Sequence, residues 1–244
     1  MAEQTPRCIV LGGINLDIQG FAGNWGGDRA EETGSSQRFL LRDPILHDSN
    51  PGRVHRTPGG VGRNIAENLA RLELCPQLVT VVGTGASWRS LIRHTRALGI
   101  GLDCSISIPG APLPVYLCIL QADCGLHTAI SDMRALEALT PERLEPLLPQ
   151  LASADCLVVD ANLPQPTIAW IAANFGRQRG SRGSSLGTEL SDGMRRPLLV
   201  ADTVSAAKAA RMRDCLGAFD IVKPNLAEMA VLADTTMEPG GHAN

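Results

Sequence analysis

Short aliphatic segments alternate with helical segments along most of the chain, and this alternation constrains the fold more than any other feature of the sequence. Runs rich in Val, Leu and Ile that stand between turn residues predict buried strands, and apolar residues that recur every three or four positions predict helices. Strands that alternate with helices form a mostly parallel sheet with helices on both faces, so an α/β protein is predicted. The predicted strands are 8–13, 78–82, 156–160, 197–202 and 220–222, and the predicted helices are 64–74, 88–98, 166–175 and 204–215, with a further helix capped by Thr140 and opened by Pro141.

A second, smaller sheet is predicted from segments that do not fit the alternation. Residues 115–120 and 126–130 are apolar and flank a short turn, which indicates a β-hairpin. Two polar segments rich in Gly, Ser and Arg are interpreted as long surface loops, at 23–43 and 176–196. The segments expected in the small sheet are 18–22, 54–56 and 115–130.

Composition and charge exclude several classes of protein. The chain has 244 residues, is 44% hydrophobic and carries a net charge of −3, so it is neither disordered nor a basic nucleic-acid-binding protein. No apolar run approaches the roughly 20 residues that span a bilayer, and the polar start lacks the core of a signal peptide. We therefore expect a cytoplasmic protein that binds neither nucleic acid nor membrane.

The cysteines and histidines give no sign of a metal centre. The seven cysteines form no C-x-x-C pair, and several stand inside apolar runs, so reduced core thiols are expected. The five histidines show neither helical pairing nor the spacing of zinc ligands. No structural metal is predicted.

The segment Gly12-Gly13-Ile14-Asn15-Leu16-Asp17 follows the first predicted strand. Ligands bind at the carboxyl ends of parallel strands, and an Asp at that position can accept hydrogen bonds from neighbouring sugar hydroxyls. The alternative is that Asn15 and Asp17 only form a turn.

The segment Pro58-Gly59-Gly60-Val61-Gly62-Arg63-Asn64 places three glycines at a helix start. Glycines there let the backbone approach a ligand closely, and the first helical N–H groups are free to bind it. Asn64 offers both a donor and an acceptor to a hydroxyl. The alternative is a glycine-rich turn with no ligand.

The segment Lys223-Pro224-Asn225-Leu226-Ala227-Glu228 follows the last predicted strand. A carboxylate at a strand end can order a hydrated Mg²⁺. The alternative is structural, because Asn225 and Glu228 also have the spacing of a helix capping box.

The segment Val81-Val82-Gly83-Thr84-Gly85 half-matches the dinucleotide-binding fingerprint, and a nicotinamide-dependent oxidoreductase is one alternative function. Trp88 stands where the third glycine should be, and the segment follows the second strand rather than the first. Both observations count against nucleotide binding there.

Taken together and in this order, the motifs resemble the ribokinase-like, or PfkB, family of carbohydrate and nucleoside kinases. The more specific matches are similar to its pseudouridine kinase branch. The opening Gly-Gly-x-Asn-x-Asp matches the family's first strand, and residues 46–53 followed by 58–72 carry the more specific match. Segments 129–133, 159–163, 203–208 and 223–228 fit the same branch.

The resemblance implies a three-layer α/β/α sandwich with a mostly parallel sheet and a small β lid, over one incomplete kinase domain at 1–244. It implies ATP-dependent phosphorylation of the 5′-hydroxyl of pseudouridine or of a related ribosyl substrate, with Mg²⁺. The small-molecule side of the site is expected to comprise Asp17, Asn15, Gly59, Gly60, Asn64, Tyr116 and Ile130. The nucleotide side is expected to comprise Asn225, Glu228, Lys223, Asp160 and Asn162, with Mg²⁺ held by Glu228 through water.

The sequence also departs from the family pattern. Family members carry their catalytic base in a Gly-Ala-Gly-Asp segment well beyond Asn-x-x-Glu, and the residues after Glu228 contain no such segment. The Asp-x-x-Gly that follows the family's second strand is replaced by Gly85-Ala86-Ser87-Trp88-Arg89. No catalytic residue is therefore predicted, and a non-catalytic nucleoside- or sugar-binding protein or an inactive shortened isoform is the alternative. Because the family's further strands are not found in this sequence, one edge of the central sheet is expected to be exposed. An exposed edge predicts poor folding, aggregation or a homodimer.

Overall fold

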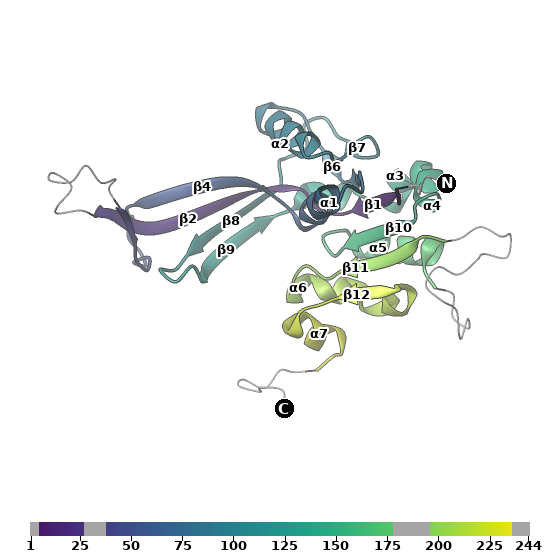
Figure 1. Cartoon of the computed structure of the whole chain (residues 1–244). Coiled ribbons are helices and arrows are strands. Elements are labelled where there is room, and N and C mark those ends of the chain that lie inside the picture. Colours follow the sequence, from purple (N-terminus) through teal and green to yellow (C-terminus); the bar gives the residue numbers. More distant parts are fainter. Residues whose placement is uncertain (1–4, 27–37, 178–195, 236–244) are drawn as a thin grey trace.

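A five-stranded, wholly parallel sheet forms the centre of the protein (Figure 1). The structure is a computed structural model that describes residues 5–26, 38–177 and 196–235. Each strand of this sheet is short and rich in Val, Leu or Ile, and the predicted parallel sheet is confirmed. In spatial order the strands are β12 (Ile221–Lys223), β11 (Leu198–Asp202), β10 (Cys156–Asp160), β1 (Cys8–Leu11) and β5 (Gln77–Val79).

Alternate residues of the central strands enter two separate cores, because successive side chains of a strand point to opposite faces. Ile9 and Leu11 of β1 pack with Leu157 and Val159 of β10 on one face. Val10 and Val158 lie on the other face, with Ala66, Trp88 and Leu91. Both faces are therefore covered by helices, and the predicted three-layer α/β/α arrangement is confirmed.

The helices predicted at 64–74, 88–98 and 166–175 are present, with shifted ends. The second core is covered by α1 (Val61–Arg71) and α2 (Ala86–Ala97). The other elements are η1 (Arg134–Ala138), α3 (Pro141–Leu144), η2 (Glu145–Leu147), α4 (Leu148–Ala152), α5 (Gln165–Phe175), α6 (Ala206–Ala209), η3 (Ala210–Ala218) and α7 (Leu226–Leu232), where η denotes a 3₁₀ helix. Within the described residues no helix is long and apolar enough to cross a bilayer.

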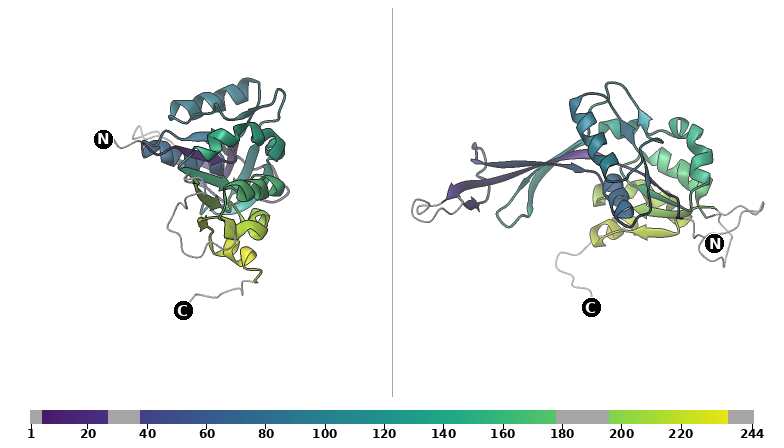
Figure 2. Two further views of the ribbon diagram at one scale, coloured as in Figure 1. Left: turned by 90° about the vertical axis from the view of Figure 1, so that its right-hand side faces the viewer. Right: turned by 45° about the horizontal axis from the view of Figure 1, so that its top comes forward.

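The small sheet projects away from the body of the protein, as Figure 1 and the right-hand view of Figure 2 show. Its central strand β2 (Asn15–Gly26) pairs in parallel with β8 (Val115–Leu120) and antiparallel with β4 (Gly52–Gly59). β9 (Leu126–Asp132) completes the predicted hairpin with β8. β3 (Arg38–Leu41) pairs with the outer end of β2. The strands are longer than the predicted segments, but the small sheet is confirmed.

Three sequence predictions need correction. The strand predicted at 78–82 is two strands, because the chain leaves the central sheet at Thr80 and β6 (Val81–Val82) pairs instead with β7 (Ile106–Ser107). The helix predicted at 204–215 is α6 followed by η3, and it begins only after Val204, whose φ of 65° a right-handed helix cannot contain.

The predicted loop at 23–43 is partly strand, since its two ends lie in β2 and β3. Its middle, 27–37, lies outside the described residues, as does 178–195 of the second predicted loop. Arg196, at the end of that second loop, is buried.

Candidate functional site

The two sheets meet directly after β1, and most of the predicted sugar-side residues lie at this junction. β1 ends at Leu11, Gly12 and Gly13 turn the chain, and β2 begins at Asn15. The strand register sets Asn15 opposite Gly59, and it sets Asp17 opposite Tyr116 of β8. Residues paired in register point to the same face of a sheet, so these side chains share one face.

Asp17 lies in a polar and tightly enclosed position. The Asn15 amide, which is 3% exposed, donates a hydrogen bond of 2.5 Å to Asp17 Oδ1. A Cβ on Gly59 would lie 2.2 Å from Asp17 Oδ2, so no other residue fits at Gly59 without displacing the carboxylate. Burial raises the pKa of Asp17, against the opposing effects of the Asn15 hydrogen bond and of the positive charge on Arg63.

The two glycine motifs pack against each other through their backbones. Gly60 has a φ of 103°, and a Cβ there would lie 2.4 Å from the Gly13 carbonyl oxygen. A Cβ on Gly62 would lie 2.8 Å from Gly12. The glycines are therefore needed for contact between the two loops, in addition to any role toward a ligand.

Arg63 is a site residue that the sequence reasoning did not assign. Its side chain is 4% exposed, and it donates at 2.8 Å both to Asn64 Oδ1 and to the Glu67 carboxylate. Since the Asn64 carbonyl is engaged, the exposed Asn64 amide presents its NH₂ group as the free donor. Helical periodicity gives no signal for this role, because an arginine in the first turn of a helix is expected to face solvent.

Tyr116 and Ile130 lie on opposite faces of the small sheet, which corrects the prediction that both cover one ligand. Tyr116 pairs with Asp17 and Ser131, whereas Ile130 pairs with Leu117, one position along the strand. Ile130 is 67% exposed. Burial, with the nearby Cys118 and Asp17, raises the pKa of Tyr116. Tyr116 therefore shares a face with Asp17, Asn15 and Gly59, which together are called the Asp17 group. Ile130 does not belong to it.

The sequence predicts Asp160 on the nucleotide side of the site. In the structure Asp160 instead lies inside the protein, where its carboxylate holds the backbone beside the site. Its side chain is completely buried. The carboxylate accepts hydrogen bonds of 2.8 Å from the backbone N–H groups of Gly13 and Asn162. Burial raises its pKa, while these N–H donors favour the charged form.

Asn162 lies beside Asp160 at the edge of the central sheet. It is 6% exposed, and its amide nitrogen would lie 3.0 Å from a Cβ on Gly13. Its Oδ1 accepts a hydrogen bond from Lys208 Nζ. Lys208 belongs to a matched segment of the sequence, but no role had been predicted for it.

The predicted capping box at the start of α7 is present, and it engages most of the Glu228 carboxylate. Asn225 Oδ1 accepts from the Glu228 N–H at 2.9 Å, and the Asn225 N–H donates to Glu228 Oε2 at 2.9 Å. Asn225 Nδ2 and the hydroxyl of Thr203 also donate to this carboxylate, at 2.8 and 2.5 Å. Glu228 is 6% exposed. Lys223 points outward, with its side chain 82% exposed and 3.7 Å from Asp202.

The donor set fits a hydrated Mg²⁺ better than a directly bound one. Three of the roughly four acceptor positions of the Glu228 carboxylate are taken by protein donors, which leaves room for one water. Within the described residues, no group of three or more His, Cys, Asp or Glu side chains has the arrangement of a metal site. Mg²⁺ bound by one carboxylate through water is compatible with this geometry.

The half-matched dinucleotide motif does not form a ligand site. A Cβ on Gly83 would lie 2.3 Å from the Trp88 indole, which donates to the Ala111 carbonyl at 2.9 Å. β6 also pairs with β7 in a separate two-stranded sheet and is not a strand of the central parallel sheet. The indole fills the space that a pyrophosphate would need, so this alternative is set aside.

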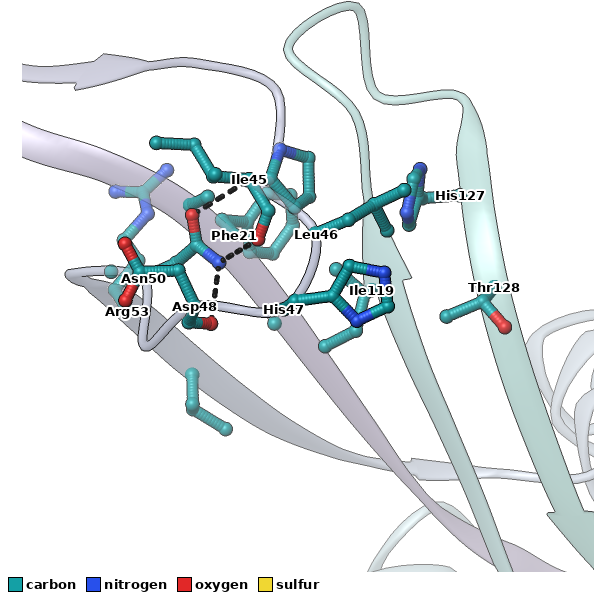
Figure 3. A pocket seen from close by; sticks show the side chains of 15 residues that line it. Phe21, Ile45, Leu46, His47, Asp48, Asn50, Arg53, Ile119, His127 and Thr128 are labelled. Atoms are coloured by element: carbon teal, nitrogen blue, oxygen red, sulfur yellow. Dashed lines mark hydrogen bonds between the residues drawn. The ribbon is translucent and has the colours of Figure 1, made fainter.

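A cavity of about 510 Å³ lies elsewhere, on the outer part of the small sheet (Figure 3). The loop that carries Leu46, His47 and Asp48 lies over one side, and Ile119 and Thr128 lie on the other. None of the Asp17 group lines this cavity. Its lining is mainly apolar, so we regard the junction of the sheets, where Asp17, Asn15 and Tyr116 share one face, as the candidate site.

The chain is similar to kinases of known sequence and structure. A family model described as pfkB family carbohydrate kinase matches residues 40–239. The pseudouridine kinase of Escherichia coli (strain K12) is 30% identical over 225 residues, and the match covers 92% of this chain and 60% of that enzyme. The chain therefore spans about three fifths of the length of this relative.

Two solved structures share the fold. A carbohydrate kinase from Agrobacterium tumefaciens superposes with a TM-score of 0.70 at 25% identity, covering 93% of this chain and 63% of that one. The Arabidopsis thaliana ribokinase solved with ribose and ATP superposes with a TM-score of 0.67 at 18% identity, covering 95% and 64%. Since the family model matches most of the sequence, the chain belongs to the pfkB family of carbohydrate kinases.

Proposed function

We propose that the protein serves ATP-dependent phosphorylation of the 5′-hydroxyl of pseudouridine or of a related ribosyl substrate. One observation carries the proposal: Asp17, Asn15 and Tyr116 share one face of the small sheet beside the glycine turns that end β1 and open α1. The 30% identity to a pseudouridine kinase supports the choice of substrate.

The residues at the junction divide the recognition of a sugar between them. Asp17 is an acceptor for ribose hydroxyls, and Asn64, with its carbonyl held by Arg63, is a donor. The glycines at 59 and 60 let the backbone approach the ring, where side chains would block it. Tyr116 supplies an aromatic surface at the same face.

The opposite part of the edge, after β10, β11 and β12, suits the phosphate groups of a nucleotide. Mg-ATP supplies the phosphoryl group and neutralises its charge when bound. Glu228, already fixed by Asn225 and Thr203, would orient a water of the metal's shell. Lys208 and Asn162 present polar groups at the end of β10.

A pair of measurements tests the proposal. Calorimetric titration of pseudouridine reports binding, and an assay for the 5′-phosphate product with Mg-ATP reports transfer. Binding together with product formation is the expected result. Neither binding nor product would contradict the proposal.

Binding without product would instead favour the second candidate, a nucleoside-binding protein without catalysis. The carboxylates described at the sheet edge support this candidate, because Asp160 has both oxygens on backbone N–H groups and Glu228 is held in a capping box. Neither is free to take a proton from a hydroxyl. The product assay separates the two candidates.

The affinity for pseudouridine should depend on pH through Asp17. Burial raises its pKa, and protonation converts an acceptor of two hydroxyls into a poorer one. Binding is therefore expected above the raised pKa, and it should be lost as the pH falls through that value. The loss should occur at a higher pH than the value of about 3.9 that describes an ordinary Asp.

Calorimetry between about pH 4 and pH 8 measures this profile. The Asp17→Asn variant should bind weakly and without the same pH dependence. An unaltered pH profile in that variant would show that another group titrates.

A further inference from the structure

The two faces of the small sheet differ in chemistry. Residues that pair in register share a face, so the strand pairings assign each side chain to one of the two. The face of Asp17 and Tyr116 also carries Gln19, His55, Thr57, Cys118, Ala129 and Ser131. At the same level the opposite face carries the apolar side chains of Ile18, Leu117 and Ile130. The polar face therefore continues outward from the Asp17 group along the small sheet.

The side chains of this face stand in rows that run across the strands. β2 begins at the junction of the two sheets, so Asn15 forms the first row, Asp17 and Tyr116 the second, and Gln19 and Cys118 the third. Successive residues on one face of a strand are about 6.6 Å apart. Gln19 therefore stands one row farther from the junction than Asp17 does.

The orientation of a ribosyl substrate sets which row its base meets. The base and the 5′-carbon leave the ribose on either side of the ring oxygen, so they project in opposite directions when the 2′- and 3′-hydroxyls bind Asp17. The proposed function directs the 5′-hydroxyl toward the edge of the central sheet where β10, β11 and β12 end. The base then points outward along the small sheet, toward the row of Gln19.

The Gln19 carboxamide is available to a ligand. Its side chain is half-buried, and no hydrogen bond joins it to another described residue. By contrast, the Asn15 amide on the same strand already donates to Asp17. Beside Gln19 the row continues with Cys118, which is 3% exposed, and then with Ala129, so short side chains leave space for a flat ring. A half-buried amide without a protein partner is stabilised when a ligand takes up its donor and its acceptor.

We propose that Gln19 is a specificity-determining residue whose carboxamide pairs with the imide edge of a pyrimidinedione base. The inference rests on the proposed function and deepens it, by naming the group of the base that the protein recognises. An imide presents an N–H between two carbonyls, and Gln19 offers an acceptor oxygen beside an NH₂ donor, so the two edges form a pair of hydrogen bonds. A site built to bind such a group rejects analogues that lack it, because its own polar atoms are then left unpaired.

Calorimetric titration of the whole chain with three ligands tests the proposal. Pseudouridine carries the imide, 3-methylpseudouridine has a methyl group in place of the imide hydrogen, and ribose has no base. The unmodified chain should bind 3-methylpseudouridine about 10- to 100-fold more weakly than pseudouridine, because two neutral hydrogen bonds are lost. This comparison needs no variant, so it does not depend on the folding of one.

Gln19→Met gives the second readout, because methionine keeps the length of the side chain and removes both hydrogen-bonding groups. The variant should bind pseudouridine about 10- to 100-fold more weakly and ribose as tightly as the unmodified chain does. It should also discriminate less than about threefold between pseudouridine and 3-methylpseudouridine, since effects on one shared interaction do not add. The matched control is Gln150→Met, which replaces an exposed glutamine of α4 and should leave all three affinities unchanged.

The outcomes separate this inference from the proposed function. If the unmodified chain binds neither pseudouridine nor ribose, both are wrong. If it binds pseudouridine and 3-methylpseudouridine equally well, only the role of Gln19 is overturned. The same conclusion would follow from a Gln19→Met variant that keeps full affinity for pseudouridine, or that loses affinity for ribose by the same factor as for pseudouridine.

Discussion

Asp220→Ala is expected to lower the free energy of unfolding by about 3–5 kcal/mol, because it leaves a buried arginine without its anion. Arg196 and Asp220 form two hydrogen bonds of 2.7 and 2.5 Å, and their side chains are 7% and 6% exposed. Asp220 Oδ2 also accepts the Leu199 N–H at 2.9 Å, so the substitution removes an anchor between β11 and the start of β12. Urea denaturation followed by circular dichroism measures the effect.

A similar pair on the surface provides the control. Arg134 and Asp132 also form a two-point contact, but their side chains are 78% and 37% exposed. Asp132→Ala should leave the urea midpoint nearly unchanged, because solvent screens an exposed pair. Equal losses for the two variants would contradict the assignment of stability to burial of the Asp220 pair.

The stabilising effect of Asp220 also has a definite pH dependence. Although burial works against ionisation, the Arg196 hydrogen bonds and the Leu199 N–H hold the pKa of Asp220 below its ordinary value. The pair therefore contributes fully above the unfolded-state pKa of about 3.9, and its contribution is lost as the pH falls through the lower folded-state pKa. The difference between the unmodified chain and Asp220→Ala should shrink in strong acid.

Asp17→Ala is expected to weaken pseudouridine binding by about 1.5–3 kcal/mol, or roughly 10- to 150-fold, the scale of a hydrogen bond to a charged group. Asp17 is the one carboxylate among the described residues that shares a face with Asn15, Gly59 and Tyr116. Its removal also leaves the Asn15 amide, which is 3% exposed, without its acceptor. Calorimetric titration measures the change.

Asp48→Ala is the matched control for that measurement. Asp48 is an exposed carboxylate that lines the cavity on the outer part of the small sheet. Its loss should leave the affinity for pseudouridine unchanged if the ligand binds at the junction of the sheets. Weak binding by Asp48→Ala together with normal binding by Asp17→Ala would transfer the site to that cavity.

The sequence predicts the layers of this fold well because burial follows a simple period. Strands such as Cys156–Asp160 are continuous apolar runs, which only a sheet covered on both faces can bury. The break at Thr80 could not be predicted in this way. It depends on the pairing of β6 with β7, which is a long-range contact invisible in a run of Val and Leu.

The candidate site is only partly predictable for a related reason. Motif spacing indicates Asp17, Gly59 and Gly60, because ligands bind at the ends of parallel strands and glycines there let the backbone approach them. It does not reveal that Asp160 is enclosed or that Ile130 faces away from Asp17, because both follow from register and depth. The role of Arg63 likewise depends on the burial of its side chain, which no short pattern encodes.

The central claim is that a ribosyl ligand binds where β1, β2 and the start of α1 meet. Amide hydrogen exchange of the whole chain, with and without saturating pseudouridine, measures the location directly. The expected result is slower exchange in peptides that cover residues 12–17 and 57–64, with no change in residues 44–50 beside the outer cavity. Slower exchange confined to 44–50, with 12–17 and 57–64 unaffected, would contradict the claim.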